Sequence, residues 1–231
     1  MFHKGDHKVV FTYNANVACD INNYILDFEL GNGSEHDSTI VNPLYRRLVS
    51  NYKDIVHIGL DAGYKIPIIM KMILDNNQVP ITPYKRPMTK RGFFKKYDFV
   101  YDEFDDDVIC PENKILKYST TDREGYRIYK SRAKDCKSCP SKYKCTESEN
   151  DVKVYTRHVW QDYMDQAEDI RHTIGSKDLY RKRSQTIERV FADGKELHGL
   201  RYTKKRGKKR VKDELLLIFA CMNLKKMAIR A

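Results

Sequence analysis

Asp61 stands where a carboxylate can take part in metal-dependent phosphoryl chemistry. It directly follows the short apolar segment 55–60 and precedes Ala62 and Gly63. This order predicts a carboxylate held at the end of a buried strand, at the rim of a sheet. The glycine lets a backbone or a substrate approach closely. The alternative is an aspartate that caps the next helix, which has the same sequence context.

Glu188 is the second candidate carboxylate. Glu188, Ala192 and Lys195 recur at spacings of three or four residues, so they share one face of a helix expected over 176–199. That face presents a metal-binding carboxylate near a cation that can bind phosphate. The alternative is an ordinary charged face exposed to solvent, the commoner use of such spacing.

Four of the six cysteines lie in the middle of the chain, at Cys110, Cys136, Cys139 and Cys145. Two residues separate Cys136 from Cys139, and this spacing forms a tight turn around tetrahedral zinc. In a reducing compartment, such a set indicates metal ligands rather than disulfides. The pattern predicts a structural zinc ion in a compact, loop-rich module. Four unpaired thiols in a cytosolic loop are the alternative.

The remaining cysteines and one histidine carry weaker signals. Cys19 and Cys221 stand in apolar patterns and are expected to be buried thiols. His36 and Asp37 could bind a metal or transfer protons. They follow a glycine turn and precede a helical pattern, so a helix cap explains them equally well.

Two basic tracts, 85–96 and 201–210, have the composition of a surface that binds a phosphate backbone. Aromatic residues among them could stack on bases. A single tract of this kind is usually a solvated surface, but two tracts flanking the candidate carboxylates favour nucleic acid. The candidate DNA contacts in the tracts are Lys85, Arg86, Lys204, Lys205 and Arg206.

The composition narrows the class of protein. The 231 residues include 43 Lys and Arg against 32 Asp and Glu, a formal net charge of +11, which indicates a polyanionic partner. A hydrophobic fraction of 41% with 16 Tyr and 9 Phe excludes a disordered chain. No apolar run approaches the roughly 20 residues of a membrane span, and the first residues lack a signal peptide. We therefore expect a cytoplasmic protein.

The elements that must position these residues alternate between strand and helix. Strands are expected at 8–19, 24–30, 55–60 and 78–84, and the first two form an antiparallel hairpin. Helices are expected at 38–52, from Ile66 to Ile73, and at 160–171, 176–199 and 212–229. The order predicts a mixed α/β sheet layer with one carboxylate at the carboxyl end of a central strand.

Together these residues resemble a known family. The segments that carry the resemblance, besides the four cysteines, are GLDAGY (59–64), PYKRPM (83–88), GFFKKYDFVYDE (92–103) and TIERVFADGKELHGLRYTKKRG (186–207). In this order they resemble an insertion-sequence DDE transposase of the branch with a cysteine-rich insertion before the third acidic residue. The resemblance covers essentially the whole chain. It implies an RNase H-like mixed sheet with flanking helices, divided into core residues 1–84, a zinc-binding insertion at 85–159 and helical core residues 160–231.

The resemblance also implies a reaction. Three carboxylates in this family bind two Mg²⁺ ions for DNA cleavage and for strand transfer by a 3′-hydroxyl. Asp61 matches the second acidic residue and Glu188 the third. Tyr180, Arg183 and Lys195 match residues that contact transposon ends. Four residues separate Arg183 from Glu188, one more than in a related branch. The implied partners are transposon-end and target DNA in the bacterial nucleoid, with a homodimer on DNA as a candidate assembly.

The first acidic residue has no counterpart in the expected order of elements. It belongs on a strand that would precede Met1, and Asp20 and Asp27 stand in the wrong places. We therefore expect the C-terminal portion of a transposase, inactive when isolated. The alternative is a non-catalytic DNA-binding remnant that holds transposon ends. An unrelated zinc-stabilised nuclease is a weaker third reading, because no histidine-rich motif accompanies the cysteines.

Overall fold

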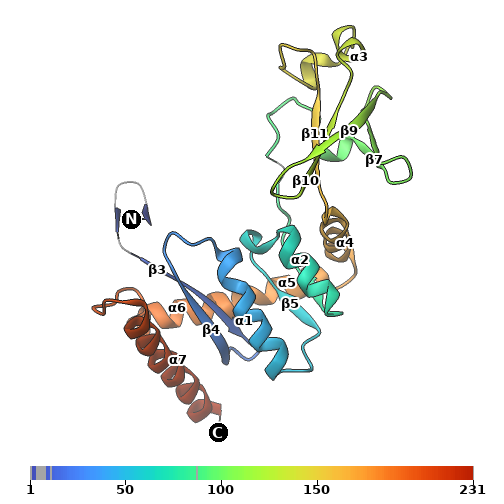
Figure 1. Ribbon diagram of the computed structural model, residues 1–231. Helices are drawn as coiled ribbons and strands as arrows, with labels where there is room; N and C mark the ends of the chain where they lie inside the picture. Colours follow the sequence, from blue (N-terminus) through green and yellow to red (C-terminus); the bar gives the residue numbers. More distant parts are fainter. Residues whose placement is uncertain (1, 4–8, 11, 87, 231) are drawn as a thin grey trace. The chain divides into compact units, whose positions relative to one another are not determined.

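The computed structural model describes residues 2–3, 9–10, 12–86 and 88–230 (Figure 1). The chain forms two compact units. Unit 1 contains residues 1–83 and 166–231, and unit 2 contains residues 84–165. The first unit is therefore built from both ends of the chain, with the second inserted between them.

The first long strands described in unit 1 form a β-hairpin. Strands β3 (Tyr13–Cys19) and β4 (Ile25–Asn32) pair antiparallel, as predicted from the sequence. Asp20 closes their turn by accepting hydrogen bonds from the backbone amides of Asn22 and Tyr24, at 2.9 and 2.8 Å. The predicted strand at 8–19 begins later than expected. Its residues 8 and 11 lie outside the described part, while Val9–Val10 (β2) pairs with Phe2–His3 (β1).

A parallel pair of strands completes the sheet elements of unit 1. Helix α1 (Asp37–Asn51) leads to β5 (His57–Gly59), and the short η1 turn (Ala62–Tyr64) leads to helix α2 (Pro67–Asp75) and strand β6 (Val79–Ile81). Strands β5 and β6 run parallel, with Gly59 opposite Ile81. Both strands therefore end at the same edge, which is where Asp61 follows β5.

Helix α4 (Gln161–His172) begins in the last residues of unit 2 and continues into unit 1. It is followed by α5 (Ser176–Gln185), α6 (Ile187–Leu197) and α7 (Lys208–Arg230). The single helix predicted over 176–199 is wrong, because the backbone leaves the helical region at Thr186, with φ −113° and ψ −99°. The hydroxyl of Thr186 donates to the carbonyl of Lys182 at 2.9 Å. Among the described residues, we find no helix whose length and apolar character suit it to crossing a bilayer.

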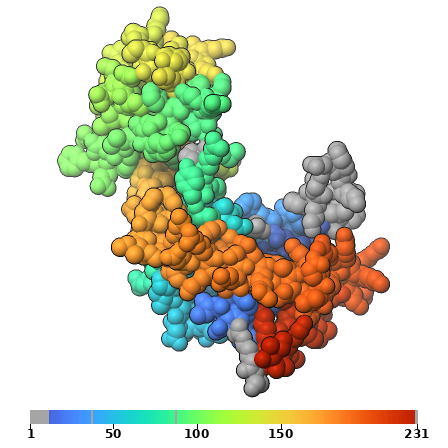
Figure 2. Space-filling model, turned by 180° about the vertical axis from the view of Figure 1, so that it is seen from behind, coloured from blue at the N-terminus to red at the C-terminus, as the bar shows by residue number. Residues whose placement is uncertain are grey.

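The core of unit 1 joins the hairpin to the last two helices. Phe28 on β4 meets Phe219 on α7 edge to face, with ring centroids 5.0 Å apart. The side chain of Asn223 bonds both backbone polar groups of Ile25, at 2.9 and 2.8 Å. Figure 2 shows the C-terminal residues, in orange and red, lying against the blue N-terminal residues of unit 1. The buried residues of this cluster are Ile25, Phe28, Leu30, Val190, Val211, Leu215, Phe219 and Met222.

Unit 2 is a five-stranded antiparallel sheet in the order β11-β10-β9-β8-β7. Its strands are β7 (Val100–Asp102), β8 (Asp107–Ile109), β9 (Ile115–Thr121), β10 (Tyr126–Lys130) and β11 (Val154–His158). Val108, Leu116 and Tyr129 are fully buried in its core. The expectation of a loop-rich module is therefore wrong for most of this unit. The cysteines lie near its irregular part, around the short helix α3 (Ala133–Lys137) and the η3 turn (Lys142–Lys144). The predicted mixed α/β class is confirmed for the chain as a whole.

Candidate active site

Asp61 lies at the carboxyl end of β5, as its sequence context predicts. The expectation of a buried, central strand is wrong, because His57 and Gly59 of β5 are exposed and, among the described residues, β5 pairs with β6 alone. The amide of Leu60 still donates to the carbonyl of Ile81 at 2.9 Å, so sheet pairing reaches the residue before the aspartate. One carboxylate oxygen of Asp61 accepts the amide of Ala62 at 2.7 Å and caps the η1 turn. The side chain is nevertheless 60% exposed. Asp61 therefore caps a turn and also presents oxygen to solvent.

Glu188 owes its position to the break between α5 and α6. It lies in the first turn of α6, and its side chain is 56% exposed. In one continuous helix, residues five apart point in directions about 140° apart, so Arg183 and Glu188 would face different sides. The non-helical backbone at Thr186 interrupts that repeat. Arg183, near the end of α5, and Glu188, near the start of α6, consequently meet.

Arg183 joins the two candidate carboxylates. Its Nη1 atom lies 3.6 Å from Oδ1 of Asp61 and 3.7 Å from Oε1 of Glu188. The same nitrogen donates a hydrogen bond to the hydroxyl of Tyr180 at 2.9 Å, and the guanidinium carbon lies 5.4 Å from the centroid of that ring. Only 17% of the Arg183 side chain is exposed. Four residues singled out from the sequence thus form one cluster, although the bridging position of Arg183 carries no sequence signal.

The cluster offers two carboxylates to a divalent cation. Carboxylate oxygens are ligands that suit Mg²⁺, and both side chains are more than half exposed. Within the described ranges, no three His, Cys, Asp or Glu side chains gather closely enough to hold a metal ion. Asp20 and Asp27 do not join the cluster, because Asp20 closes the hairpin turn and Asp27 pairs with Arg47 at 2.7 Å. The strand predicted before Met1 lies outside the described residues.

A basic groove lies elsewhere on unit 1. It encloses about 1280 Å³ between β3, α6, α7 and the 199–206 loop. The predicted DNA contacts Lys195, Lys204, Lys205 and Arg206 line it, together with Arg201 and Tyr202, which the prediction did not single out. The loop is tied down where the amide of Gly207 donates to the hydroxyl of Tyr13 at 3.1 Å. The basic tract 201–210 is only partly a loop, because α7 begins at Lys208. Lys85 and Arg86 are exposed residues of unit 2.

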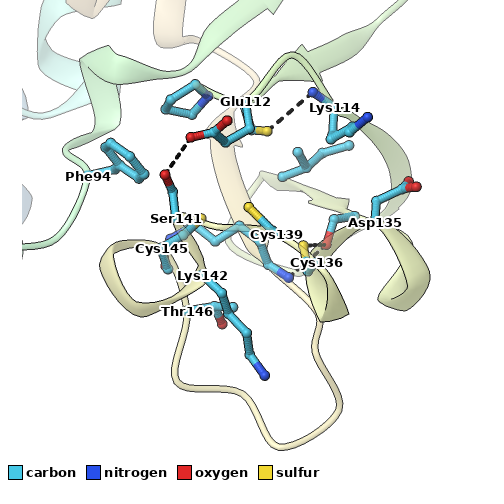
Figure 3. Close-up of a pocket in the computed structure, with 15 residues that line it drawn as sticks. Phe94, Glu112, Lys114, Asp135, Cys136, Cys139, Ser141, Lys142, Cys145 and Thr146 are labelled. Carbon is cyan, nitrogen blue, oxygen red and sulfur yellow. Dashed lines mark hydrogen bonds between the residues drawn. The ribbon is translucent and has the colours of Figure 1, made fainter.

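The four central cysteines line one small cavity of about 20 Å³ in unit 2 (Figure 3). The backbone amide of Lys114 donates to the sulfur of Cys110 at 3.3 Å, and the hydroxyl of Ser131 lies 3.1 Å from the sulfur of Cys136. Burial raises the pKa of the Cys145 thiol, and the other three cysteines raise it further, while Lys153 lowers it. The thiols are therefore electrostatic neighbours. Among the described residues, they do not form a group placed to hold a metal ion.

The structure also tests the predictions for Cys221, Cys19 and His36. Cys221 is exposed, so the expectation of a buried thiol is wrong. It lies on α7 away from Phe219 and Met222, which face the hairpin. Cys19 is partly buried, and burial raises the pKa of its thiol to about 11. His36 is the N-cap of α1, where its ring accepts the amide of Ser38 at 3.3 Å, and this matches the capping alternative.

Comparison with known proteins gives one match. The family model described as the transposase DDE domain matches residues 109–228. This range includes the four central cysteines, Arg183, Glu188 and the basic groove loop, and it begins after Asp61. No curated protein and no solved structure matches the chain.

Proposed function

Because the chain belongs to the transposase DDE domain family, we propose that it carries out DNA transposition at the ends of an insertion sequence. The proposed chemistry is Mg²⁺-dependent cleavage of DNA followed by strand transfer, in which the freed 3′-hydroxyl attacks a phosphodiester of the target and displaces the target's 3′-oxygen. The observation that carries this proposal is the meeting of Asp61 and Glu188 at Arg183, from parts of the chain that are distant in sequence.

Asp61 and Glu188 are the proposed metal-binding carboxylates, as the second and third acidic residues of the family pattern. A divalent cation supplies activation of the attacking hydroxyl and stabilisation of the leaving oxygen. The chain's own residues bind that cation and position the DNA. Support comes from the exposure of both carboxylates, at 60% and 56%, because a metal and a phosphate must both reach them.

The proposed DNA contacts lie in three places. Tyr180 and Arg183 flank the carboxylates. Lys195 and the loop residues Lys204, Lys205 and Arg206 line the basic groove, where their positive charges attract a polyanionic chain. Lys85 and Arg86 lie in unit 2 and are the contacts with DNA that we propose for that unit. Lysine and arginine supply most of the affinity for a phosphate backbone.

We further propose that Cys110, Cys136, Cys139 and Cys145 hold one structural zinc ion. Four thiols on one cavity are the donor set that zinc prefers, and the amide that donates to Cys110 is the kind of contact that stabilises a thiolate. The zinc-binding unit is proposed as an insertion, residues 85–159, between two parts of an RNase H-like core, and a homodimer is the proposed assembly on DNA.

The test is an excision assay in cells, on a plasmid that carries the coding region with its native DNA on both sides. Asp61→Asn and Glu188→Gln are each expected to reduce excision at least about a hundredfold, because loss of even an outer-shell partner of a metal costs about 10- to 100-fold. The matched control is Asp193→Asn, which removes a carboxylate from the same helix, where it lies 4.0 Å from Arg189. The control should retain excision.

Two results would contradict the proposal. If the Asp61→Asn variant excises at the wild-type rate, Asp61 is not a metal ligand. Salt-sensitive DNA binding by the wild-type chain, with no metal-dependent cleavage of any native end, supports the non-catalytic binding role instead.

A further inference from the structure

The guanidinium of Arg183 lies within ion-pair distance of both Asp61 and Glu188, the two carboxylates proposed to hold a divalent cation. Among the described residues, it is the cation in ion-pair contact with each of them. Two carboxylates that approach one position repel each other unless a positive charge lies between them. Arg183 supplies a positive charge to both.

We propose that Arg183 is the internal counter-ion of the metal-free site and that it competes with the divalent cation for Asp61 and Glu188. This inference rests on the proposed function, because it assumes that the two carboxylates bind metal. In it, Arg183 acts through the carboxylates as a positioning residue. The cation binds only as the guanidinium withdraws.

The contacts of Arg183 allow its guanidinium to move away from the two carboxylates. Its distances to the two carboxylates, 3.6 and 3.7 Å, are longer than a hydrogen bond, and ion pairs between partly exposed groups are weak. Its hydrogen bond to Tyr180 is short by comparison, at 2.9 Å. A guanidinium stays protonated at any ordinary pH, so it must leave by moving rather than by losing a proton. Tyr180 is the anchor that keeps it nearby.

A simpler role for Arg183 makes the opposite prediction. If it only holds the two carboxylates in the geometry that metal requires, its removal weakens metal binding. If it competes with the metal, its removal strengthens binding. The sign of the change therefore separates the two roles.

The experiment measures Mn²⁺ binding to the full chain by calorimetry, with Mn²⁺ as the probe for the divalent site. Arg183→Gln is expected to tighten binding roughly three- to tenfold, the size expected for two weak ion pairs. Arg183→Lys keeps a charge and should change affinity less. The control is Lys182→Gln, which removes an exposed charge from the same helix and should leave affinity within about twofold, since solvent screens it.

A second measurement uses the wild-type protein and so does not depend on the variant folding. The side-chain ¹⁵N signal of Arg183, assigned by its loss in Arg183→Gln or Arg183→Lys, is expected to shift when Mg²⁺ is added. A signal that stays fixed at saturating Mg²⁺ overturns the inference. So does an Arg183→Gln variant that binds Mn²⁺ no more tightly than Lys182→Gln.

Two further variants distinguish failure of the inference from failure of the proposed function. Asp61→Asn and Glu188→Gln should each weaken Mn²⁺ binding. If they do, and Arg183→Gln matches its control, only the competition by Arg183 is wrong. If neither carboxylate variant changes the affinity, the metal site itself is wrong and the inference falls with it.

Discussion

The ammonium group of Lys65 has almost no access to solvent. Whether its burial lowers the stability of the fold depends on its ion-pair partner. Its side chain is 6% exposed, and its ammonium pairs with the carboxylate of Glu168 on α4. Arg171 also donates to Glu168, at 2.8 Å. Hydrogen bonds from Arg171 and then from Lys65 lower the pKa of Glu168 to about 2. A buried ammonium without a partner is costly, so this pair carries more energy than the exposed ion pairs around it.

Replacing Glu168 by glutamine is therefore expected to lower the free energy of unfolding by about 1–3 kcal/mol at pH 7, since it leaves a buried charge unpaired. The value is below that of a fully buried pair because the Glu168 side chain is 36% exposed. The measurement is urea unfolding of Glu168→Gln and wild type. The control Glu149→Gln removes an exposed carboxylate and should change little.

The same pair predicts a pH dependence. The pKa of Glu168 is depressed on folding, from 4.5 to about 2, so its contribution to stability is complete above the unfolded value. It declines as the pH falls from about 4.5 towards 2, where the folded carboxyl protonates. The gap between wild type and Glu168→Gln should shrink over that range. A gap that stays constant down to pH 3 would count against the pair.

At the scale of elements, the break at Thr186 is the feature that sequence patterns could not supply. Both α5 and α6 keep a helical repeat, and no glycine or proline marks the boundary, so periodicity predicts one helix. The β3–β4 hairpin and the placement of Asp61 after β5 were predictable because strand alternation and turn residues are local signals. The meeting of Arg183 with both carboxylates depends on tertiary packing, which no local pattern encodes.

The sheet of unit 2 is not predictable from sequence patterns for a related reason. Its cysteines and charged loops suggested an irregular module, whereas its backbone forms a five-stranded sheet. Most residues of β9 are exposed, and only Leu116 on that strand is buried. A strand with one buried side chain has little of the alternation that identifies strands in a sequence.

The proposed zinc ion yields a prediction at this scale. The purified chain should contain about one zinc per molecule, and Cys139→Ser should lose it, because three thiolates hold zinc less well than the four of a closed structural site. Chelation should lower the thermal midpoint, since metal binding contributes directly to folding. The control Cys221→Ser replaces an exposed thiol on α7. Zinc content is measured by elemental mass spectrometry. Equal zinc content in Cys139→Ser and wild type would show that these cysteines do not hold the ion.

The whole molecule carries a net charge of +11, and five lysine and arginine residues line the groove. Lys204, Lys205 and Arg206 line this groove together with Lys195. Each phosphate contact that is lost reduces the salt dependence of DNA binding by about one unit of slope. We therefore expect the cations of the groove to contribute more to DNA binding than exposed cations elsewhere on the surface.

Changing Lys204, Lys205 and Arg206 together to glutamine should weaken binding to any duplex and reduce the slope of log K against log salt by about two to three. The measurement is fluorescence anisotropy between about 50 and 200 mM salt. A control with glutamine at Lys53, Arg123 and Lys225, which are exposed cations outside the groove, removes the same charge. If both triple variants lower the slope equally, the groove has no special part in binding.

The insertion of unit 2 between the two parts of unit 1 sets the order in which the chain can fold during synthesis. All of unit 2 has been translated once residue 165 is added, so it can fold while the hairpin still lacks its covering helices. Ile25, Phe28 and Leu30 remain exposed until Val190 and the α7 residues emerge. Domains generally fold as units as they leave the ribosome. Here the N-terminal strands must wait, and a ribosome that stalls between the two units leaves an apolar hairpin face available to chaperones.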